Sequence, residues 1–406
     1  MKNIQLHPVK LFISKHGLLT GIVLVALVAR LAYLFLFVGP ASYPINFDSI
    51  EHHLIAQNLV EGKGYSMYGA PTAYRAPFLS YFMAFGYLIF GQSFAVVRLG
   101  MILLSLFLVW GIYLLANEIF DHKTGLWAAF LAAIYPHLIF YSSRIYTELP
   151  FTLFSVFATV CFARYFSSQS LRFLGLTAVS LALAILARPV GFVLVGFMLL
   201  ILLWKQRTQH RLKDATVLSV MVILLLSPWF IRNYQVFDRF VPVTTQGGVV
   251  LWVGNNHYMA HHPYYGGGHT LYQYLPGAEQ LITDSEIDRS RIAFRYFLNF
   301  LQEYPEDIPL LIRKKVLNFW KKEFVTGSSR RWIYEYSYLL VLFFAAGGVI
   351  LAAIYRRNGL FFLWTLFLAN FIPALIFWAG PRIRFPAEPV LIILAAFLLE
   401  EIRRRS

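Results

Sequence analysis

Long apolar runs separated by short polar stretches dominate this chain. A run of about 20 mostly apolar residues can cross the ~30 Å hydrocarbon core of a bilayer as a helix. Ten segments are close to this requirement: 18–38, 93–115, 124–141, 148–165, 171–187, 190–204, 215–232, 336–354, 360–379 and 387–402. The pattern therefore predicts an all-α polytopic membrane protein with about 10 transmembrane helices, or 11 or more if the ambiguous run 77–91 also spans.

Composition supports this prediction and narrows the classes of function. Of the 406 residues, 58% are hydrophobic and only 14% are charged, which excludes an ordinary soluble globular fold. The 35 Lys and Arg outnumber the 20 Asp and Glu, so the formal charge is +15. A nucleic-acid binder would carry that charge on a polar chain, whereas here it flanks apolar runs. We therefore expect a membrane partner and no nucleic acid.

The positions of Lys and Arg predict the orientation. With ten spans, the basic clusters all fall on one side, which the positive-inside rule makes cytoplasmic. The clusters are Lys2, Lys10 and Lys15; Arg164 and Arg172; Lys205, Arg207, Arg211 and Lys213; Arg356 and Arg357; and Arg403 to Arg405. Counting 77–91 as a span would put the later clusters on the wrong side, so we interpret that run as an interfacial or re-entrant element. The first apolar run is too long for a cleaved signal peptide.

This topology divides the chain into three regions. Residues 1–232 form an N-terminal membrane module that includes a first outer loop at 39–92. Residues 233–335 form an extracytoplasmic loop region, rich in glycine turns and followed by polar, helix-like sequence. Residues 336–406 form the C-terminal transmembrane helices and a basic cytoplasmic tail. We expect the chemistry in the outer loops, on the periplasmic face of the inner (plasma) membrane.

The first outer loop contains closely spaced ionisable residues. A helix that begins near Asp48 and ends at Gly62 or Gly64 would lie on the membrane surface and carry Asp48, Glu51 and His52 on one face. Convergent carboxylates suit general base catalysis, in which a carboxylate takes a proton from an attacking hydroxyl. The alternative is structural: Asp48 caps the helix and Glu51 completes a capping box.

Further ionisable residues lie near the outer ends of the predicted spans. They are Arg144, Glu148, Arg188, Arg232, Arg382 and Arg384. Charges are costly in a membrane, and guanidinium groups bind phosphate through paired donors, so these residues could hold a phosphorylated ligand. Alternatively, Arg144 with Glu148 and Arg384 with Glu388 could form structural pairs, because each pair is four residues apart.

Four histidines in the second outer loop suggest a metal but lack a fixed ligand spacing. They are His257, His261, His262 and His269. We therefore interpret them as loop residues that bind no metal.

Several different short motifs follow one another along the membrane portion. After Asp48 come Gly62-x-Gly64-Tyr65, Pro71-Thr72, Arg75-x-Pro77, Phe90-Gly91, Arg98, Tyr135-Pro136, Tyr141-Ser142, Thr147-Glu148, Arg188-Pro189, Pro228-Trp229, Arg232-Asn233, Gly254-Asn255-Asn256 and Arg382-x-Arg384-Phe385-x-x-Glu388-Pro389. This set resembles the polyprenyl-phosphate-sugar-dependent membrane glycosyltransferases of the C superfamily, in the bacterial branch related to protein O-mannosyltransferases and lipid A aminoarabinose transferase. Many such relatives carry adjacent Asp-Glu, whereas Ser49 follows Asp48 here. Which of Asp48 and Glu51 is essential therefore stays open, with Asp48 favoured.

The resemblance implies transfer of a hexosyl or pentosyl group from a polyprenyl-phosphate donor to an acceptor hydroxyl, with inversion. The acceptor would be a glycolipid, lipid A, a polysaccharide or a protein. The implied catalytic residues are Asp48 and Glu51. The implied donor-phosphate ligands are Arg75, Arg144, Arg188, Arg382 and Arg384, and the implied acceptor-binding residues are His52, Glu148, Asn255, Asn256 and His257. No cofactor is required, although an acidic pair could hold a divalent metal.

Two other functions fit a basic, multi-spanning chain. One is an oligosaccharide ligase or polymerase that uses a polyprenyl-diphosphate donor. The other is a transporter or flippase for lipid-linked sugars, which would bind phosphate without chemistry. Transporters tend to have repeated halves, and the sequence contains no visible repeat.

Overall fold

The computed structural model describes residues 7–43, 46–205, 211–264, 266–283, 285–323 and 331–406. Lys2 and Arg207 of the predicted basic clusters lie outside the described residues. Within these ranges the regular structure is helical, apart from one hairpin of two short strands, β1 (Ser66–Met67) and β2 (Ala70–Pro71). The predicted all-α class is confirmed.

Every predicted apolar segment forms helix. The helices of the membrane body are α1 (His7–Tyr33, continued by a π-helical turn at Leu34–Val38), α3 (Pro77–Phe90), α4 (Phe94–Ile119), α5 (His122–Ile134), α6 (Pro136–Ser142), α7 (Glu148–Ser168), α8 (Leu171–Ala187), α9 (Gly191–Lys205), α10 (Arg211–Phe237), α15 (Arg331–Ile354), α16 (Leu360–Ile376) and α18 (Glu388–Arg405). The short α17 (Pro381–Arg384) and a 3-10 turn at Phe385–Ala387 join α16 to α18.

Within the described residues, fewer helices than predicted are long and apolar enough to cross a bilayer. Five segments are long and apolar enough: Gly17–Val38, Phe94–Ile119, Glu148–Ser168, Arg211–Phe237 and Arg331–Ile354. The pair α5 and α6 makes a sixth if it counts as one bent span, and α3, α8, α9 and α16 are shorter apolar helices. The chain is thus a multi-pass α-helical membrane protein, and the expected count of ten spans is not confirmed.

The predicted span 124–141 is not one straight helix. It bends by 60° where Tyr135 separates α5 from α6. Pro136 has no N–H to donate to the preceding turn, so the break leaves helix carbonyls without partners. Buried Arg30 of α1 donates to two of them, the carbonyls of Ala133 at 3.0 Å and Ala132 at 3.3 Å. A buried guanidinium therefore compensates a broken helix.

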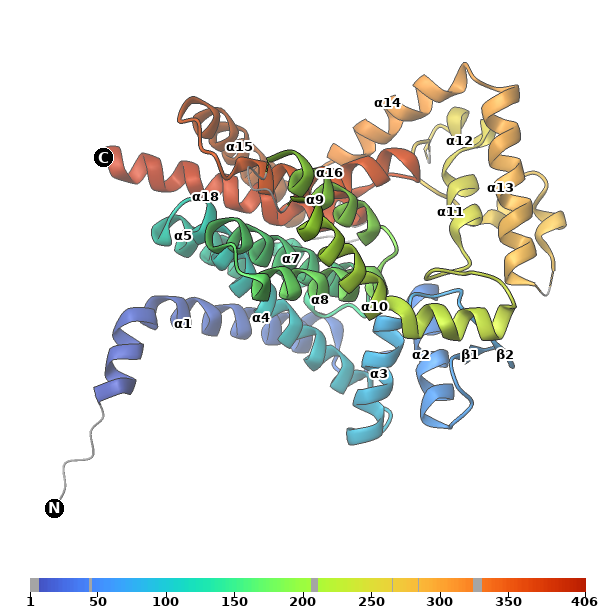
Figure 1. The fold of residues 1–406 in the computed structure, drawn as a ribbon, viewed down its shortest axis with the longest axis horizontal. Helices are drawn as coiled ribbons and strands as arrows, with labels where there is room; N and C mark the ends of the chain where they lie inside the picture. The colour runs from blue at the N-terminus through green and yellow to red at the C-terminus, as the bar shows by residue number, and fades with distance from the viewer. Residues whose placement is uncertain (1–6, 44–45, 206–210, 265, 284, 324–330) are drawn as a thin grey trace.

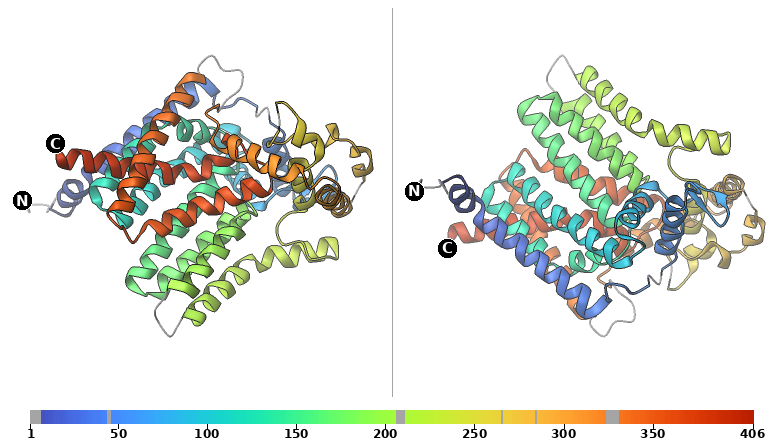
Figure 2. Two further views of the ribbon diagram at one scale, coloured as in Figure 1. Left: turned by 90° about the horizontal axis from the view of Figure 1, so that it is seen from above. Right: turned by 90° about the horizontal axis from the view of Figure 1, so that it is seen from below.

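The buried interior lies between helices that are distant in sequence. α18 is at the centre, where it packs against α5 and α15 and buries an almost continuous run from Glu388 to Phe397. A second apolar cluster joins α8, α9 and α10 to α7 and α16. The start of α1 and the end of α18 lie at the same end of the molecule (Figures 1 and 2).

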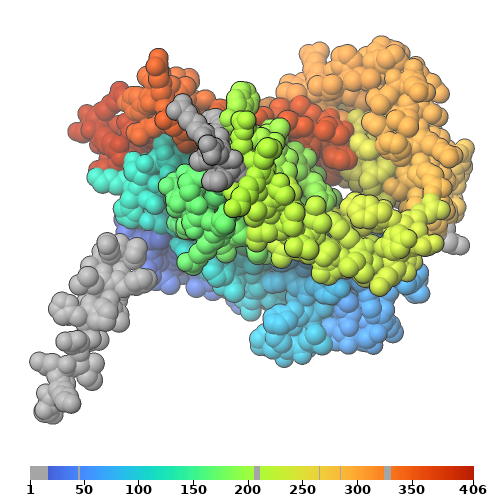
Figure 3. Space-filling model, viewed as in Figure 1, coloured from blue at the N-terminus to red at the C-terminus, as the bar shows by residue number. Residues whose placement is uncertain are grey.

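A small helical cap stands at the opposite end of the molecule (Figures 1 and 3). It consists of α11 (Gly247–Gly254), α12 (His257–His261), α13 (Glu286–Glu303) and α14 (Asp307–Trp320), with 3-10 turns at Tyr272–Tyr274 and Ala278–Leu281. The cap has its own apolar cluster, which includes Trp252, Met259 and Phe300. α10 runs past the predicted end at residue 232 and leads into the cap.

Close packing of α15 on α18 depends on Gly348. A Cβ atom at this position would overlap the backbone carbonyl oxygen of Leu394, whereas a Cβ at Gly196 of α9 would meet no atom within 4 Å. We expect Gly348→Ala to lower the melting temperature in detergent by several degrees, because overpacking forces backbone shifts. Gly196→Ala is the matched control and should leave the melting temperature equal or slightly higher, since alanine favours helix. Equal melting temperatures for the two variants would contradict this account.

Candidate active site

The helix that carries the predicted carboxylates is α2 (Phe47–Val60). Its N-cap is Asn46, whose side chain accepts a hydrogen bond from the Ser49 N–H at 2.7 Å. Asp48 and Glu51 are therefore free of the capping roles that the structural alternative assigned to them. Both carboxylates point to other partners.

Three polar contacts fix α2 against its neighbours. The Ser49 hydroxyl donates to the carbonyl of Ile145 at 2.7 Å, which ties α2 to the segment before α7. The Nδ1 of His52 lies 2.8 Å from the Ser80 hydroxyl, and the Nδ1 of His53 lies 2.9 Å from the Tyr87 hydroxyl, both on α3. These buried contacts determine the direction in which Asp48 and Glu51 point.

The carboxylates belong to an alternating chain of acids and arginines, which we call the acid–arginine chain. Its members, in spatial order, are Glu51, Arg75, Asp48, Arg382, Glu148 and Arg188. Asp48 holds Arg75 and Arg382 on separate oxygens, each at 2.7 Å. Arg382 also donates to Glu148 at 2.6 Å, and Arg75 also pairs with Glu51.

Arg188 is the last member, and its Nη1 lies 2.6 Å from Glu148 without hydrogen-bond alignment. Three carboxylates and three guanidinium groups thus balance in formal charge, which makes their burial tolerable. Glu148 is fully buried, whereas the side chains of Asp48 and Arg382 keep 30% and 33% of their surface exposed. The middle of the chain is therefore its accessible part.

The arginines set the ionisation of the two carboxylates of α2. Burial would raise the pKa of Asp48, but the guanidinium groups of Arg75 and Arg382 outweigh burial and hold the pKa well below its usual range. Burial raises the pKa of Glu51, and Arg75 opposes it only in part. Burial also lowers the pKa of His52 to about 3, so this imidazole is neutral. Asp48 is therefore an anion held between two cations.

Tyr146 and His269 were not predicted as site residues. The guanidinium of Arg382 lies over the ring of Tyr146, 4.6 Å from its centroid. The ring of His269 lies against that of Trp378, tilted by 33° with 3.8 Å between centroids. Burial lowers the pKa of His269, and the charges of Arg382 and Asp48 also act on it. His269 was grouped with other loop histidines because its proximity to Asp48 arises only from the fold.

Arg384 and Arg144 do not join the acid–arginine chain. Arg384 is fully buried, pairs with Glu388 at 3.1 Å, and donates to the carbonyls of Phe319 and Lys321. The structural pairing of Arg384 with Glu388 is thus observed, and the phosphate-binding role inferred for Arg384 does not fit its position. Arg144 lies over the ring of Phe140, and Glu148 pairs with Arg382 and Arg188 instead of Arg144.

The three predicted acceptor-binding residues of the cap make internal contacts. The Asn255 amide donates to carbonyls of Leu251 and Ile376, and its oxygen accepts from Lys315 at 2.5 Å. Asn256 is the N-cap of α12. His257 contacts Asp307. Of the predicted acceptor-binding residues, only Glu148 is a member of the acid–arginine chain.

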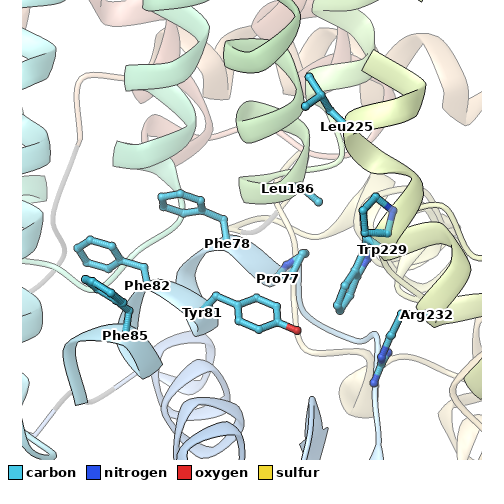
Figure 4. A pocket seen from close by; sticks show the side chains of 10 residues that line it. Pro77, Phe78, Tyr81, Phe82, Phe85, Leu186, Leu225, Trp229 and Arg232 are labelled. Carbon is cyan, nitrogen blue, oxygen red and sulfur yellow. The ribbon is translucent and has the colours of Figure 1, made fainter. Parts of the chain in front are cut away.

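An apolar groove of about 520 Å³ lies between α3, α8 and α10 (Figure 4). Its walls come from the start of α3, the end of α8 and the middle of α10. They are formed by Pro77, Phe78, Tyr81, Phe82, Phe85, Leu186, Leu225, Pro228, Trp229 and Arg232. Pro77 and Leu186 are each two residues from a member of the chain, Arg75 and Arg188, so the groove and the charged residues share their supporting segments.

Comparison with known families confirms the resemblance that the motifs indicated. Residues 74–231 match the family described as dolichyl-phosphate-mannose-protein mannosyltransferase. This stretch contains Arg75, Glu148 and Arg188, whereas Asp48 and Arg382 lie outside it. A search of curated proteins found no match.

Two solved oligosaccharyltransferase structures share the fold at low sequence identity. The archaeal oligosaccharyltransferase AglB from Archaeoglobus fulgidus, in complex with an inhibitory peptide and a dolichol-phosphate, matches with a TM-score of 0.58 at 13% identity, over 97% of this chain and 51% of that chain. The apo form of the oligosaccharyltransferase of that organism gives 0.58 at 15% identity, over 96% and 51%. ArnT from Cupriavidus metallidurans in the apo state gives 0.47 at 12% identity, over 95% and 77%. The chain thus spans about half the length of the oligosaccharyltransferases.

Loss of one arginine should change the ionisation of Asp48. Arg382→Gln removes one of the two cations that stabilise the Asp48 anion, so we expect the pKa of Asp48 to rise. A water-soluble carbodiimide attacks protonated carboxyl groups, and peptide mass spectrometry can follow the labelling of Asp48 against pH. Half-labelling should occur at a higher pH in Arg382→Gln than in the unmodified protein.

The matched control is Arg291→Gln, which removes an exposed arginine of α13 that pairs with Asp288. Its labelling profile at Asp48 should equal that of the unmodified protein. Identical profiles for Arg382→Gln and Arg291→Gln would show that Arg382 does not act on Asp48.

Proposed function

We propose that this protein is a membrane glycosyltransferase that moves a sugar from a polyprenyl-phosphate donor to an acceptor hydroxyl, with inversion at the anomeric carbon. The observation that carries this proposal is the acid–arginine chain, in which a part-exposed aspartate lies between two arginines at the cap end of the membrane body. The match of residues 74–231 to a family named for dolichyl-phosphate-mannose supports the donor class.

In this proposal Asp48 is the base. The acceptor oxygen forms a bond to the anomeric carbon, its proton passes to Asp48, and the bond from that carbon to the phosphate oxygen breaks, with the electron pair leaving on the lipid phosphate. Arg75 and Arg382 stabilise the negative charge that grows on this phosphate. Inversion follows because acceptor and leaving group occupy opposite faces of the sugar in a single displacement.

The ion pairs of Asp48 give the reaction an order. Both carboxylate oxygens already hold an arginine, and the resulting low pKa makes Asp48 a weak base. A donor phosphate competes for the same guanidinium groups and draws them from Asp48. The pKa of Asp48 then rises, so the donor itself prepares the base. The donor therefore binds before the acceptor is deprotonated.

The apolar groove fits the polyprenyl part of the donor. It is lined by aromatic and aliphatic side chains together with Arg232, and Pro77 and Leu186 of its wall are each two residues from Arg75 and Arg188 (Figure 4). In this proposal, a donor whose phosphate binds Arg75 extends its hydrocarbon tail between α3 and α10. Nucleotide sugars are made in the cytoplasm, and a lipid carrier delivers the sugar across the membrane. We accordingly place the active site on the periplasmic face of the inner membrane, opposite the basic C-terminus.

A second candidate function is transfer of a whole oligosaccharide from a lipid-linked donor. The two Archaeoglobus fulgidus structures favour it, because they share the fold and are oligosaccharyltransferases. A panel of donors separates the candidates. Consumption of a polyprenyl monophosphate sugar supports our proposal, consumption of a diphosphate oligosaccharide supports the second, and movement of lipid without consumption supports a flippase.

Substitution of Asp48 tests its role as the base. We expect Asp48→Asn to reduce transfer by roughly 10²–10⁴-fold, the usual contribution of a general base. Binding of polyprenyl phosphate should be retained or become tighter, since the variant leaves the acid–arginine chain with a net positive charge. Transfer is measured as released lipid phosphate by mass spectrometry.

Glu51→Gln is the matched comparison on the same helix and should cost less activity, because Glu51 contacts only Arg75 within the chain. Full activity of Asp48→Asn, or a larger loss in Glu51→Gln, would refute the assignment of Asp48.

The groove is tested separately with donors of different length. Phe85→Gln places a polar side chain on the groove wall, so we expect a higher KM for a long-chain polyprenyl donor, with little change in kcat or in the KM for a short-chain analogue. Phe343→Gln is the control, because this phenylalanine of α15 is similarly exposed, at 72% against 64% for Phe85, but lies outside the groove. Equal effects on long and short donors would exclude the groove as the lipid site.

A further inference from the structure

Two histidines and an aspartate meet on the surface of the cap, away from the acid–arginine chain. Asp307, the first residue of α14, accepts from His257 Nδ1 and from His261 Nε2, each at 2.7 Å and on separate oxygens. One potential metal-binding atom from each residue lies within 4.8 Å of the other two. From this geometry we infer that His257, His261 and Asp307 form a binding site for a divalent transition metal ion of the zinc class.

The local structure suits this ligand set. His257 and His261 are four residues apart on α12, the spacing that places two imidazoles on one helix face for zinc binding. The ring of His257 stacks on Tyr304, 4.4 Å between centroids, which fixes its orientation. Imidazole and carboxylate together are typical zinc ligands.

Little rearrangement is needed to accommodate the ion. Ligands at about 2.0–2.1 Å around a tetrahedral ion lie roughly 3.3 Å apart, so the three groups need to move by about 1 Å. Each imidazole must present a lone pair instead of a proton, which the neutral ring achieves by a change of tautomer. The histidine side chains are 53% and 55% exposed, so the remaining coordination position opens to water.

Such an ion would connect the cap to the segment that carries Arg382. α12 directly follows Asn255, and α14 carries Lys315, which donates to Asn255 and to the carbonyl of Leu375 at 3.0 Å. Leu375 lies at the end of α16, just before the loop to Arg382. A metal that joins α12 to the start of α14 would therefore fix the positions of Asn255 and Lys315, two residues through which the cap contacts the end of α16. The inference does not depend on the proposed glycosyl transfer.

The experiment is a zinc titration of the full chain in detergent after removal of metal with a chelator. We expect one Zn²⁺ per chain by calorimetry and a higher melting temperature with Zn²⁺ present, because an ion that binds only the folded state stabilises it. Co²⁺ should give the visible absorption of a tetrahedral nitrogen–oxygen site. His261→Ala and Asp307→Asn should each weaken binding by ~10-fold or more, since even an indirect ligand partner is worth that much.

The matched control is His262→Ala, which removes the neighbouring histidine outside the cluster and should bind Zn²⁺ as the unmodified chain does. Melting temperatures without metal reveal whether a variant has lost its fold, and only folded variants are compared. Two results would overturn the site: no saturable binding to the unmodified chain, or equal affinity in His261→Ala, Asp307→Asn and His262→Ala. In either case, the three residues form only a hydrogen-bonded link between α12 and α14.

Discussion

The position of Asp48 between Arg75 and Arg382 is the interaction on which the rest of the site depends. These groups come from α2, from the loop after the hairpin and from α17, so their ion pairs join the segment that contains α2 and the hairpin to α17, more than 300 residues later in the chain. If Asp48 lost both arginines, or if an arginine lost its carboxylate, a partly buried ion would be left uncompensated, which is costly at a membrane body. The charge balance of the acid–arginine chain is thus a requirement for the stability of the folded site.

The paired charges of the acid–arginine chain also bear on how its arginines would bind a donor phosphate in the proposed reaction. Arginines that are already oriented by carboxylates need no large rearrangement to turn toward a new anion, and planar guanidinium groups offer several donors at once. Glu148 stays behind as the buried counter-charge, whereas Asp48 is accessible and would be released. In the proposed reaction, one arrangement therefore supplies the phosphate-binding groups and controls the basicity of Asp48.

The arginines at the ends of spans separate into two kinds only in the folded protein. Arg30 and Arg384 donate to backbone carbonyls in the interior, where they stabilise a broken helix and the joint between α14 and α17. Arg75, Arg188 and Arg382 keep part of their surface exposed and pair with carboxylates. The sequence assigned Arg75, Arg188, Arg382 and Arg384 the same phosphate-binding role, because position along the chain does not reveal which way a side chain points.

The sequence by itself determined the all-α membrane class, the helical segments and the helix near Asp48 with its two carboxylates, because apolar run length and local spacing control these features. It also contained motifs within residues 74–231, the stretch that matches a family model. Only the tertiary structure decided that Asp48 lies between Arg75 and Arg382, that Glu148 lies between Arg382 and Arg188, and that Asp307 meets the histidines of α12. Those contacts join residues up to hundreds of positions apart, and packing between helices, which no local pattern encodes, brings them together.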